Sequence, residues 1–427
     1  MKKQTIIIAI AGGTLCLVGL LLFIFRSKAP VIEDLKELEQ IPAKKMVQLK
    51  LSSNAAIKYV EVSMSQNAKE TSLLKDMPNK KLVDLTLTIE PRKLSIEDGK
   101  AEITVKAVAG RFAKTQEIVS TTIDTIPPEI SLIDCSYITD QGSSAAALIK
   151  AKDAKSVYIK EADNTYPATN EISEDKQRFF VIYPIGLDLP LNTPIFAEAV
   201  DLAGNKASTP VKTILKRTVY RKDTLKITED FVKRHVYPLL KTTDMPPLDA
   251  FKTVNEKWRA EAEEKIKGLT KTSANKMLWS GPFVQMKNSK VFAHFGDLRS
   301  YEYEGKIVSN SRHLGFDLAS LSNIPVEAAN SGVILFTGDL GIYGNVIIID
   351  HGLGLMSFYA HLSTIDVTVG QNVERASIVG HSGMTGFAGG DHVHFAMLLH
   401  GQYVSPVAWW DKMWIEKRVL NVLNKKE

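Results

Sequence analysis

The chain of 427 residues is predicted to be a mainly β, multidomain protein. Three observations lead to this fold class. The chain opens with a long apolar run, most of its first half alternates in Val, Ile and Thr, and helical spacing of apolar residues is confined to one central stretch. We therefore expect an N-terminal transmembrane helix, two β-sandwich domains, a helical connector and a C-terminal domain built on an antiparallel β-sheet.

The bulk composition narrows the classes of function. The net charge of +5 suits attraction to anionic polymers or lipid head groups, and it is too small to indicate a nucleic-acid-binding protein. Of the two cysteines, Cys16 lies inside the apolar run and Cys135 lies far beyond it. We therefore expect neither a disulfide nor a thiolate metal site.

Residues 1–28 are interpreted as a transmembrane signal anchor. The twenty mostly apolar residues from Ile6 to Phe25 would span about 30 Å as a helix, which matches the hydrocarbon layer. No small-residue cleavage site follows Phe25, so we expect the anchor to stay uncleaved. With the N-terminus in the cytoplasm, the rest of the chain is exported as one body.

A stalk and two β domains are expected next. Residues 29–45 are charged and contain prolines, which indicates a stalk. Residues 46–126 and 127–216 each contain short β segments; these are Val47–Leu51, Ile57–Ser63, Leu82–Ile89, Ala101–Val108, Glu129–Ile133, Ala145–Ala151, Ser156–Lys160, Phe179–Ile182 and Ile195–Val200. The junction 124–128 and the turn 201–205 resemble those of tandem bacterial immunoglobulin-like domains. That resemblance implies two sandwiches, which we interpret as spacers.

Residues 217–285 form the predicted helical connector. Thr228 begins a short helix that Pro238 should stop. A longer helix is expected from Leu248 to Lys267, because apolar residues recur there every three to four positions; these are Phe251, Val254, Trp258, Ala262 and Ile266. We interpret this stripe as a packing face. Helices at this place in the chain could also cover a cleft of the following domain.

The C-terminal part of the chain is rich in histidine, with seven of the nine histidines between positions 313 and 400. If residues 313–317 and 392–394 are strands, His313 and Asp317 share one face with Gly315 between them, and His392 and His394 share another. Two strands can then present three ligands to one metal and leave imidazoles for chemistry. Nitrogen and oxygen ligands of this kind predict a catalytic zinc site with one Zn²⁺ per chain.

Five elements of the stretch 286–410 carry a family resemblance. They are His313-x-x-x-Asp317, Tyr343-Gly-Asn followed by Asp350-His-Gly-Leu-Gly354, Tyr359-Ala-His-Leu362, Gly380-His-Ser-Gly-Met-Thr-Gly386, and His392-x-His394. In this order they resemble the lysostaphin-like zinc endopeptidases, which cleave peptidoglycan cross-bridges. The resemblance implies a zinc peptidase domain over 286–410, peptidoglycan peptide cross-links as the substrate, and a single-pass protein of the bacterial inner membrane facing the periplasm or outside. Residues 411–427 are expected to form a tail helix.

The same resemblance assigns roles to single residues. It makes His313, Asp317 and His394 the zinc ligands, and His361 and His392 the unligated catalytic pair. One of the pair would accept a proton from water and the other would stabilise the oxyanion, in an order that stays open. Tyr343 and Asn345 are candidates for the substrate groove, although a turn role for Asn345 is equally open.

The other histidines are interpreted as structural; they are His235, His294, His351, His381 and His400. His351 and His381 lie in family-like loops and could form hydrogen bonds behind the site. Asp391 stands where the family often has Pro, and would raise the pKa of His392 if it lay close.

Three alternatives accompany this interpretation. The first is a catalytically silent activator or scaffold for other cell-wall hydrolases. The second is a non-haem iron enzyme, since two histidines and one carboxylate also form that site. The third is a protein that is mainly a scaffold, in which the immunoglobulin-like units bind partners and turnover is incidental. A regulatory protein is a further candidate partner.

Overall fold

The computed structural model describes residues 28–111 and 113–426, which form two compact units. The first unit contains the described residues up to 128 together with 200–206, and the second contains 129–199 and 207–426. The transmembrane anchor predicted for residues 1–28 lies outside the described residues, except for Lys28. Within the described ranges, no helix is long and apolar enough to cross a membrane.

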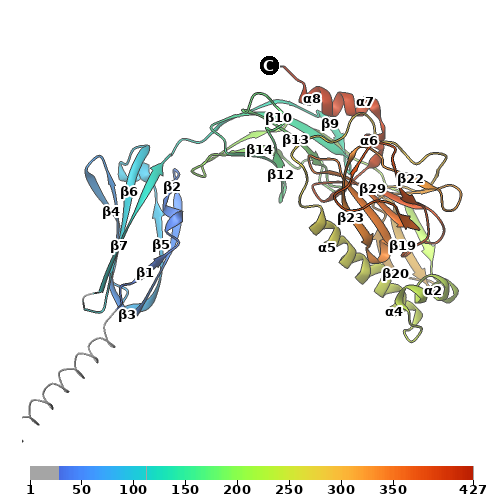
Figure 1. The fold of residues 1–427 in the computed structure, drawn as a ribbon, viewed down its shortest axis with the longest axis horizontal. Helices are drawn as coiled ribbons and strands as arrows, with labels where there is room; N and C mark the ends of the chain where they lie inside the picture. The colour runs from blue at the N-terminus through green and yellow to red at the C-terminus, as the bar shows by residue number, and fades with distance from the viewer. Residues whose placement is uncertain (1–27, 112, 427) are drawn as a thin grey trace, which may run out of the picture. The chain divides into compact units, whose positions relative to one another are not determined.

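The first unit is a seven-stranded sheet around its own apolar core (Figure 1). Its elements are β1 (Val31–Glu33), η1 (Leu35–Leu38), β2 (Gln40–Ile41), β3 (Lys45–Gln66), β4 (Lys69–Asp76), β5 (Lys80–Ile89), η2 (Pro91–Leu94), β6 (Gly99–Ala109) and β7 (Ala113–Ile123). The long β3 pairs with β5 along its first half and with β6 along its second half. Two strands that the sequence predicted separately are therefore one strand.

The structure corrects the stalk predicted for residues 29–45. Strand β1 pairs with β3, and Leu38 and Ile41 are completely buried in the core of the first unit. Leu38 and Ile41 have exposed charged residues near them in the sequence, so the sequence pattern did not indicate that they belong to the core. This segment is part of the folded unit.

The turn at residues 200–206 also belongs to the first unit. The side-chain amide of Asn205 donates to the carbonyl oxygen of Asp124 at 2.7 Å and accepts from the backbone N–H of Ala43 at 2.8 Å. The carboxylate of Asp201 receives the N–H groups of Gly204 and Asn205, which fixes the turn. The predicted boundaries 46–126 and 127–216 therefore differ from the observed grouping of the chain.

The second unit begins with two small sheets. Its first strands are β8 (Glu129–Cys135), β9 (Ile138–Asp140), β10 (Ser144–Lys152), β11 (Ser156–Glu161), β12 (Asn164–Ala168), β13 (Arg178–Pro184), β14 (Ile195–Val200), β15 (Lys206–Pro210) and β16 (Ile214–Lys216). The sheet orders are β13-β10-β8 and β12-β11-β14-β15, and β9 pairs with β16. The strands predicted here overlap β8, β10, β11, β13 and β14. The immunoglobulin-like identity stays a prediction.

The connector is helical, as predicted. Its elements are α2 (Glu229–His235), α3 (Tyr237–Leu240), α4 (Pro247–Lys252), η3 (Thr253–Trp258) and α5 (Arg259–Leu269), and the last three follow one another without a break. Thr228 caps α2 by accepting from the N–H of Phe231 at 3.1 Å. Pro238 lies in the first turn of α3. Backbone N–H groups in the first turn of a helix form no intrahelical hydrogen bond, so a proline there costs none.

The C-terminal domain is centred on an eight-stranded antiparallel sheet. Its strands, in order across the sheet, are β18 (Lys290–Ala293), β21 (Phe316–Ala319), β29 (Val393–Leu399), β25 (Leu355–Leu362), β24 (Asn345–Asp350), β23 (Gly332–Asp339) and β27 (Asn372–Val373), with β30 (Gln402–Val404) on β29. Two smaller sheets complete it: β17 (Lys222–Lys226), β19 (Leu298–Tyr303) and β20 (Lys306–Arg312), and β22 (Pro325–Glu327), β28 (Ile378–His381) and β26 (Thr364–Ile365). The short helix η4 (Gly341–Tyr343) precedes β24.

Both faces of this sheet are buried, which explains its nearly continuous apolar strands. Phe358 and Ala396 point to one face, where they pack with Phe251, Val254, Ala262 and Ile266 of the connector. The predicted helical stripe is therefore a packing face; of its five residues, Trp258 alone is partly exposed. On the other face, Tyr359 and Phe395 pack with the C-terminal helices α6 (Pro406–Trp410), α7 (Lys412–Ile415), η5 (Glu416–Leu420) and α8 (Asn421–Leu423). Figure 1 shows α5 and the C-terminal helices on opposite sides of the domain.

The sheet β13-β10-β8 packs directly against the C-terminal domain. Leu148, Phe180 and Ile182 belong to the same apolar core as Trp409, whose indole N–H donates to the Ser144 hydroxyl at 3.2 Å. The neighbouring residues of β10 and β13 face the other way, into the core between the two small sheets. In the structure, the region interpreted as a spacer is thus part of the body that contains the histidine cluster.

Candidate metal centre

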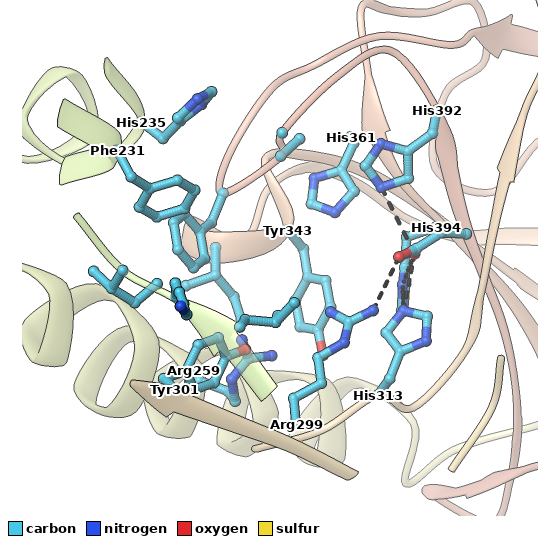
Figure 2. A pocket seen from close by; sticks show the side chains of 18 residues that line it. Phe231, His235, Arg259, Arg299, Tyr301, His313, Tyr343, His361, His392 and His394 are labelled. Carbon is cyan, nitrogen blue, oxygen red and sulfur yellow. Dashed lines mark hydrogen bonds and ion pairs between the residues drawn. The ribbon is translucent and has the colours of Figure 1, made fainter. Parts of the chain in front are cut away.

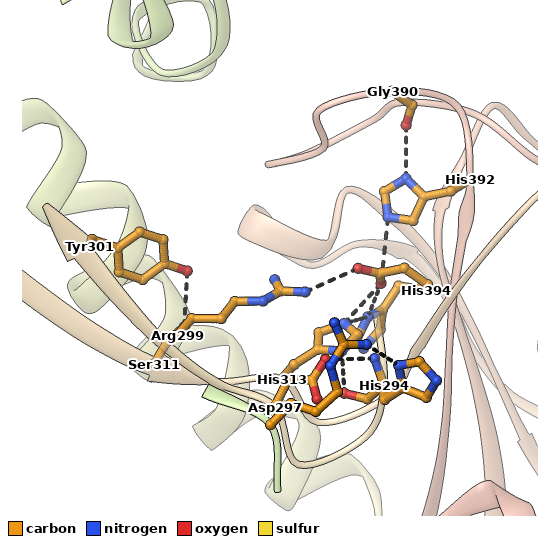
Figure 3. Close-up of polar contacts among 11 residues, drawn as sticks. His294, Asp297, Arg299, Tyr301, Ser311, His313, Gly390, His392 and His394 are labelled. Atoms are coloured by element: carbon orange, nitrogen blue, oxygen red, sulfur yellow. Dashed lines mark hydrogen bonds and ion pairs between the residues drawn. The ribbon is translucent and has the colours of Figure 1, made fainter. Parts of the chain in front are cut away.

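Three predicted ligand atoms converge at one point on the connector-facing side of the sheet. Asp317 on β21 lies directly opposite His394 on β29, so their side chains share a face. The Oδ1 atom of Asp317 is 3.0 Å from Nδ1 of His394 and 2.8 Å from Nε2 of His313. The two imidazole nitrogens are 3.0 Å apart (Figure 3). Residue 313 lies in the loop between β20 and β21, not in a strand as the sequence argument assumed.

The donor set fits a zinc ion with three protein ligands. Nδ1 of His313 lies 3.0 Å from the carbonyl oxygen of His294, which can only accept, so this nitrogen carries the proton and Nε2 keeps its lone pair. Both imidazoles and the carboxylate are at least largely buried. Two imidazole nitrogens and one carboxylate oxygen, with a fourth position left for water, form the usual ligand set of a hydrolytic zinc.

Gly315 makes room for this arrangement. A Cβ atom at this position would lie 2.7 Å from Nε2 of His394 and 2.6 Å from the carbonyl oxygen of Phe395. Any side chain would therefore push against the ring of a ligand and against the backbone of β29. The glycine that the sequence places between His313 and Asp317 is a steric requirement.

The protonation states suit a metal. Burial acts to raise the pKa of Asp317, but the charges and hydrogen bonds of His313 and His394 outweigh it and hold that pKa well below its usual value. Burial lowers the pKa of His394 to about 4. The carboxylate is thus ionised and the imidazole neutral near pH 7, as metal ligation requires. Arg299 donates to the second oxygen of Asp317 at 3.3 Å.

His361 reaches the site through an unusual backbone conformation. Ala360 on β25 lies opposite His394, so the next residue of a regular strand would face away from the metal side. His361 instead has a φ of 63°, and its ring centroid lies 4.7 Å from that of His392. Its Nδ1 donates to the carbonyl oxygen of Thr385 at 2.8 Å, which leaves Nε2 as an acceptor. Burial, followed by the charges of His392 and His394, lowers its pKa to about 3.

His392 lies immediately before β29 and points at the same cluster (Figure 2). Its Nδ1 donates to the carbonyl oxygen of Gly390 at 2.8 Å, and its Nε2 is 3.6 Å from Oδ1 of Asp317. The neighbouring Asp391 does not approach this ring with a hydrogen bond. Its carboxylate accepts from the Ser382 hydroxyl at 2.6 Å and from the N–H of Asn323 at 3.0 Å.

The site opens into a cavity of about 300 Å³. One wall contains the five predicted metal and catalytic residues together with Tyr343. The facing wall comes from the connector and from β19, through Phe231, His235, Arg259 and Tyr301 (Figure 2). Ile227 also lines the cavity, and Arg299 of β19 extends to Asp317. The connector therefore forms one side of the cleft.

The two candidate substrate residues lie in different places. Tyr343 lines the cavity with its ring 5.5 Å from that of His394, and its hydroxyl donates to Glu263 of α5 at 2.6 Å. Asn345 is not among the residues lining the cavity. Its backbone N–H donates to the Thr385 hydroxyl at 2.9 Å and its side-chain amide donates to the carbonyl oxygen of Leu362 at 3.1 Å, which supports the loop that holds His361.

The remaining histidines have structural partners or line the cavity. His351 is fully buried between the Ser331 carbonyl oxygen and the Ser357 hydroxyl, and His400 contacts the Ile182 carbonyl oxygen. His381 lies 3.2 Å from Asp366. His294 supports the ligand His313 through its carbonyl oxygen. His235 packs against Phe231, with ring centroids 4.9 Å apart, and also lines the cavity.

Sequence reasoning missed five residues at the site, namely Arg259, Glu263, Arg299, Tyr301 and Phe387. Arg259 and Glu263 lie beside the apolar stripe of the long helix, among polar residues that the sequence pattern places at the surface. Arg299 and Tyr301 precede the first recognisable motif, at 313–317. Their separation of two positions on one strand indicates that Arg299 and Tyr301 share a face, but nothing in the sequence shows which cavity that face lines.

Comparison with known proteins finds a family match that includes the site. Residues 311–406 match peptidase family M23. The DD-carboxypeptidase/endopeptidase Mpg of Neisseria meningitidis is 41% identical over 96 residues, and the peptidoglycan DD-endopeptidase ShyA of Vibrio cholerae is 38% identical over 93 residues. Each match covers 22% of this chain and 22% of the relative, so the chain spans about a fifth of the length of these relatives. The catalytic domain of lysostaphin from Staphylococcus simulans is 28% identical, covering 29% of this chain and 92% of that domain, with a TM-score of 0.25.

Proposed function

From the peptidase family M23 domain formed by residues 311–406, we propose that this protein is a zinc endopeptidase that hydrolyses peptide cross-links of bacterial peptidoglycan. The convergence of His313, Asp317 and His394 within 3.0 Å of one another is the observation that supports it most directly. The two relatives similar to this chain are named a DD-carboxypeptidase/endopeptidase and a peptidoglycan DD-endopeptidase, which supports a peptidoglycan substrate.

The chain's own residues prepare hydrolysis in three ways. His313, Asp317 and His394 would hold the ion, and the chemistry it supplies when bound is activation of water and polarisation of a carbonyl group. Arg299 fixes the carboxylate of Asp317 through the oxygen that does not face the histidines. The apolar residues Ile227, Phe231 and Phe387 surround the cavity and limit the water that reaches the reacting bond.

His361 and His392 are proposed to transfer protons. Each has its Nδ1–H committed to a backbone carbonyl oxygen, so each presents an Nε2 lone pair to the cavity. An imidazole in this tautomer can take the proton of the attacking water and then donate it to the leaving amine. Either ring has the tautomer that this step needs.

We also propose that residues 1–28 anchor the protein in the cytoplasmic membrane, with the catalytic domain exported. The apolar run from Ile6 to Phe25, with basic residues on both sides, supports this location. Protease treatment of intact spheroplasts tests it: residues 29–427 should be degraded from outside, and full protection of the chain would contradict the proposed orientation.

The enzymatic proposal is tested with the purified full-length protein and isolated peptidoglycan. We expect about one zinc per chain, and release of fragments with new amino and carboxyl ends that a chelator abolishes and added zinc restores. The His394→Ala protein should bind less zinc and release no fragments. Iron in place of zinc would favour the oxygenase alternative, and stimulation of a separate hydrolase without metal binding would favour the activator.

A further inference from the structure

We propose that Arg259 and Arg299 form a carboxylate-binding subsite, so that the preferred substrate has a free carboxylate within about two residues of the bond that is cut. The proposal rests on the proposed function and names a chemical feature of its substrate. Both arginines line the cavity that contains the predicted zinc ligands (Figure 2).

Arg259 is held in place by a neutral partner. Its Nε donates to the carbonyl oxygen of Asn255 at 3.1 Å, and its Nη2 donates to the side-chain oxygen of the same residue at 3.0 Å. Asn255 is 1% exposed, and its amide nitrogen donates to the Ser309 hydroxyl on β20 at 3.0 Å. The guanidinium is therefore oriented in advance by a neutral partner. Its charge also acts on the nearby Glu263 and opposes the effect of burial on the pKa of that carboxyl group.

Arg299 contributes from the adjacent strand β19. It shares the cavity-facing side of that strand with Tyr301, whose hydroxyl is fixed by Ser311 at 2.9 Å (Figure 3). One of its N–H groups contacts Asp317, and a guanidinium has five N–H donors in a planar fork. Arg299 can therefore contact a second carboxylate without releasing the metal ligand.

The cavity contains no acidic group that would satisfy both arginines. Among the described residues that line it, Asp317 is the only acidic side chain, and that carboxylate faces the predicted ion. Glu263, one helical turn after Arg259, accepts a hydrogen bond from Tyr343, and burial raises the pKa of its carboxyl group. The facing wall is thus a cationic surface in a largely apolar cavity, where a carboxylate is the complementary ligand.

The size of the cavity sets the position of that carboxylate. The arginines and the predicted zinc ligands line one cavity of about 300 Å³. Because an extended peptide rises by only about 3.4 Å per residue, a carboxylate that reaches the arginines belongs to a residue close to the bond at the zinc ligands. The reacting carbonyl group would lie at the predicted zinc ligands. Arg299 lies beside them through its contact with Asp317, and Arg259 lines the same cavity from helix α5. A carboxylate next to the scissile bond would place a negative charge at these two guanidinium groups, whereas a carboxamide at that position offers them no charge.

The test compares two synthetic cross-linked peptides that differ only in having a free carboxylate or a carboxamide beside the scissile bond. With the zinc-loaded full-length protein, we expect kcat/KM to be about ten- to a hundredfold higher for the carboxylate peptide, as for a hydrogen bond between charged groups. The Arg259→Gln variant should lose most of this preference by slowing only the carboxylate peptide. Arg259→Lys should retain part of it.

Lys267→Gln is the matched control, because Lys267 is an exposed residue of the same helix and does not line the cavity. It should retain the full preference. Equal rates for the two peptides in the unmodified protein would overturn the subsite, as would an Arg259→Gln protein that slows both peptides equally. An equal loss of rate for both peptides would show that Arg259 contributes to the structure of the helix and does not bind the substrate carboxylate.

Calorimetric binding of the same peptides separates this proposal from the proposed function. If neither peptide is cleaved, the endopeptidase proposal fails, while tighter binding of the carboxylate peptide that Arg259→Gln removes would still support the subsite. Equal binding of both peptides would overturn the subsite even in an active enzyme.

Discussion

Asp317 and His394 face each other across the strands β21 and β29, with Oδ1 and Nδ1 3.0 Å apart, although 77 positions separate them in the chain. The register of two strands therefore brings together ligands from two different sequence motifs. His313 completes the cluster from the loop that precedes β21.

Replacing Asp317 with Asn is expected to weaken zinc binding by more than about a hundredfold, because even residues behind the ligands change affinity by 10–100-fold. The substitution removes the negative charge and keeps the shape. Zinc content and competition with a chelator measure the loss. His381→Ala, outside the cavity, is the control and should keep one zinc per chain; full zinc content in Asp317→Asn would show that Asp317 is no ligand.

Gly315→Ala is expected to destabilise the protein by about 1–3 kcal/mol, as overpacking does, and to reduce zinc affinity. The added Cβ would lie 2.6 Å from the Phe395 carbonyl oxygen and 2.7 Å from Nε2 of His394. Gly268→Ala on α5 meets nothing within 4 Å and should stabilise the helix by about 0.5–1 kcal/mol. Denaturant unfolding should therefore give changes of opposite sign.

Thr385→Val is expected to lower kcat by about tenfold with zinc content unchanged, because general acid–base catalysis contributes about 10²–10⁴-fold and misorientation loses part of it. The Thr385 hydroxyl donates to the Leu362 carbonyl oxygen at 2.8 Å and accepts from the N–H of Asn345. These bonds fix the loop whose carbonyl oxygen orients His361. Thr385→Ser keeps the hydroxyl and should restore the rate; an equal loss in both variants would contradict this role.

Protonation of His351 is expected to make stability fall as the pH is lowered. Burial lowers its pKa from 6.5 to about 4, so the folded state resists a proton that the unfolded chain accepts. Its contribution is complete above pH 6.5 and is lost progressively toward pH 4, by a total of about 3 kcal/mol. His351→Gln should flatten the dependence of the unfolding free energy on pH over this range. If the substitution left the dependence of the unfolding free energy on pH unchanged, His351 would take up its proton at the same pH in the folded and unfolded states.

Trp409→Ala is expected to destabilise the second unit as a whole by about 3–5 kcal/mol. Trp409 is completely buried beside Trp279 and Phe283 and donates to Ser144 of β10. Hydrogen exchange should therefore increase both in β10 and in β29. Val407→Ala, 53% exposed on the same helix, is the control. Faster exchange confined to β29 would mean that the two regions unfold independently.

The convergence of His313, Asp317 and His394 and the helical packing stripe could be predicted because their signals are local. The separation of four between His313 and Asp317 and the repeat of Phe251, Val254, Ala262 and Ile266 each lie within one short segment. The shared core around Trp409 could not be predicted in the same way. Continuous apolar runs such as 145–149 indicate strands that are buried on both faces. They do not show which part of the chain packs against the second face, here the C-terminal domain.

The geometry of the site depends on details that have no sequence pattern. The left-handed backbone of His361 directs its side chain to the metal side against the strand alternation. Arg259 lines the cavity from helix α5. The spacing of apolar residues in that helix predicts which side is buried, but it does not predict which polar side chains beside it reach the cavity. Such features arise from tertiary packing, so they became visible only with the fold.

Helix α5 covers one face of the sheet and also supplies Arg259 to the cavity. The predicted metal ligands and the connector wall are therefore encoded in separate stretches of the gene. A chimera that exchanges residues 217–285 for another connector, while keeping the four buried apolar residues of the stripe, would alter substrate preference and leave every zinc ligand untouched. In this architecture, the proposed selectivity can diverge between descendants while the proposed hydrolytic chemistry is inherited unchanged.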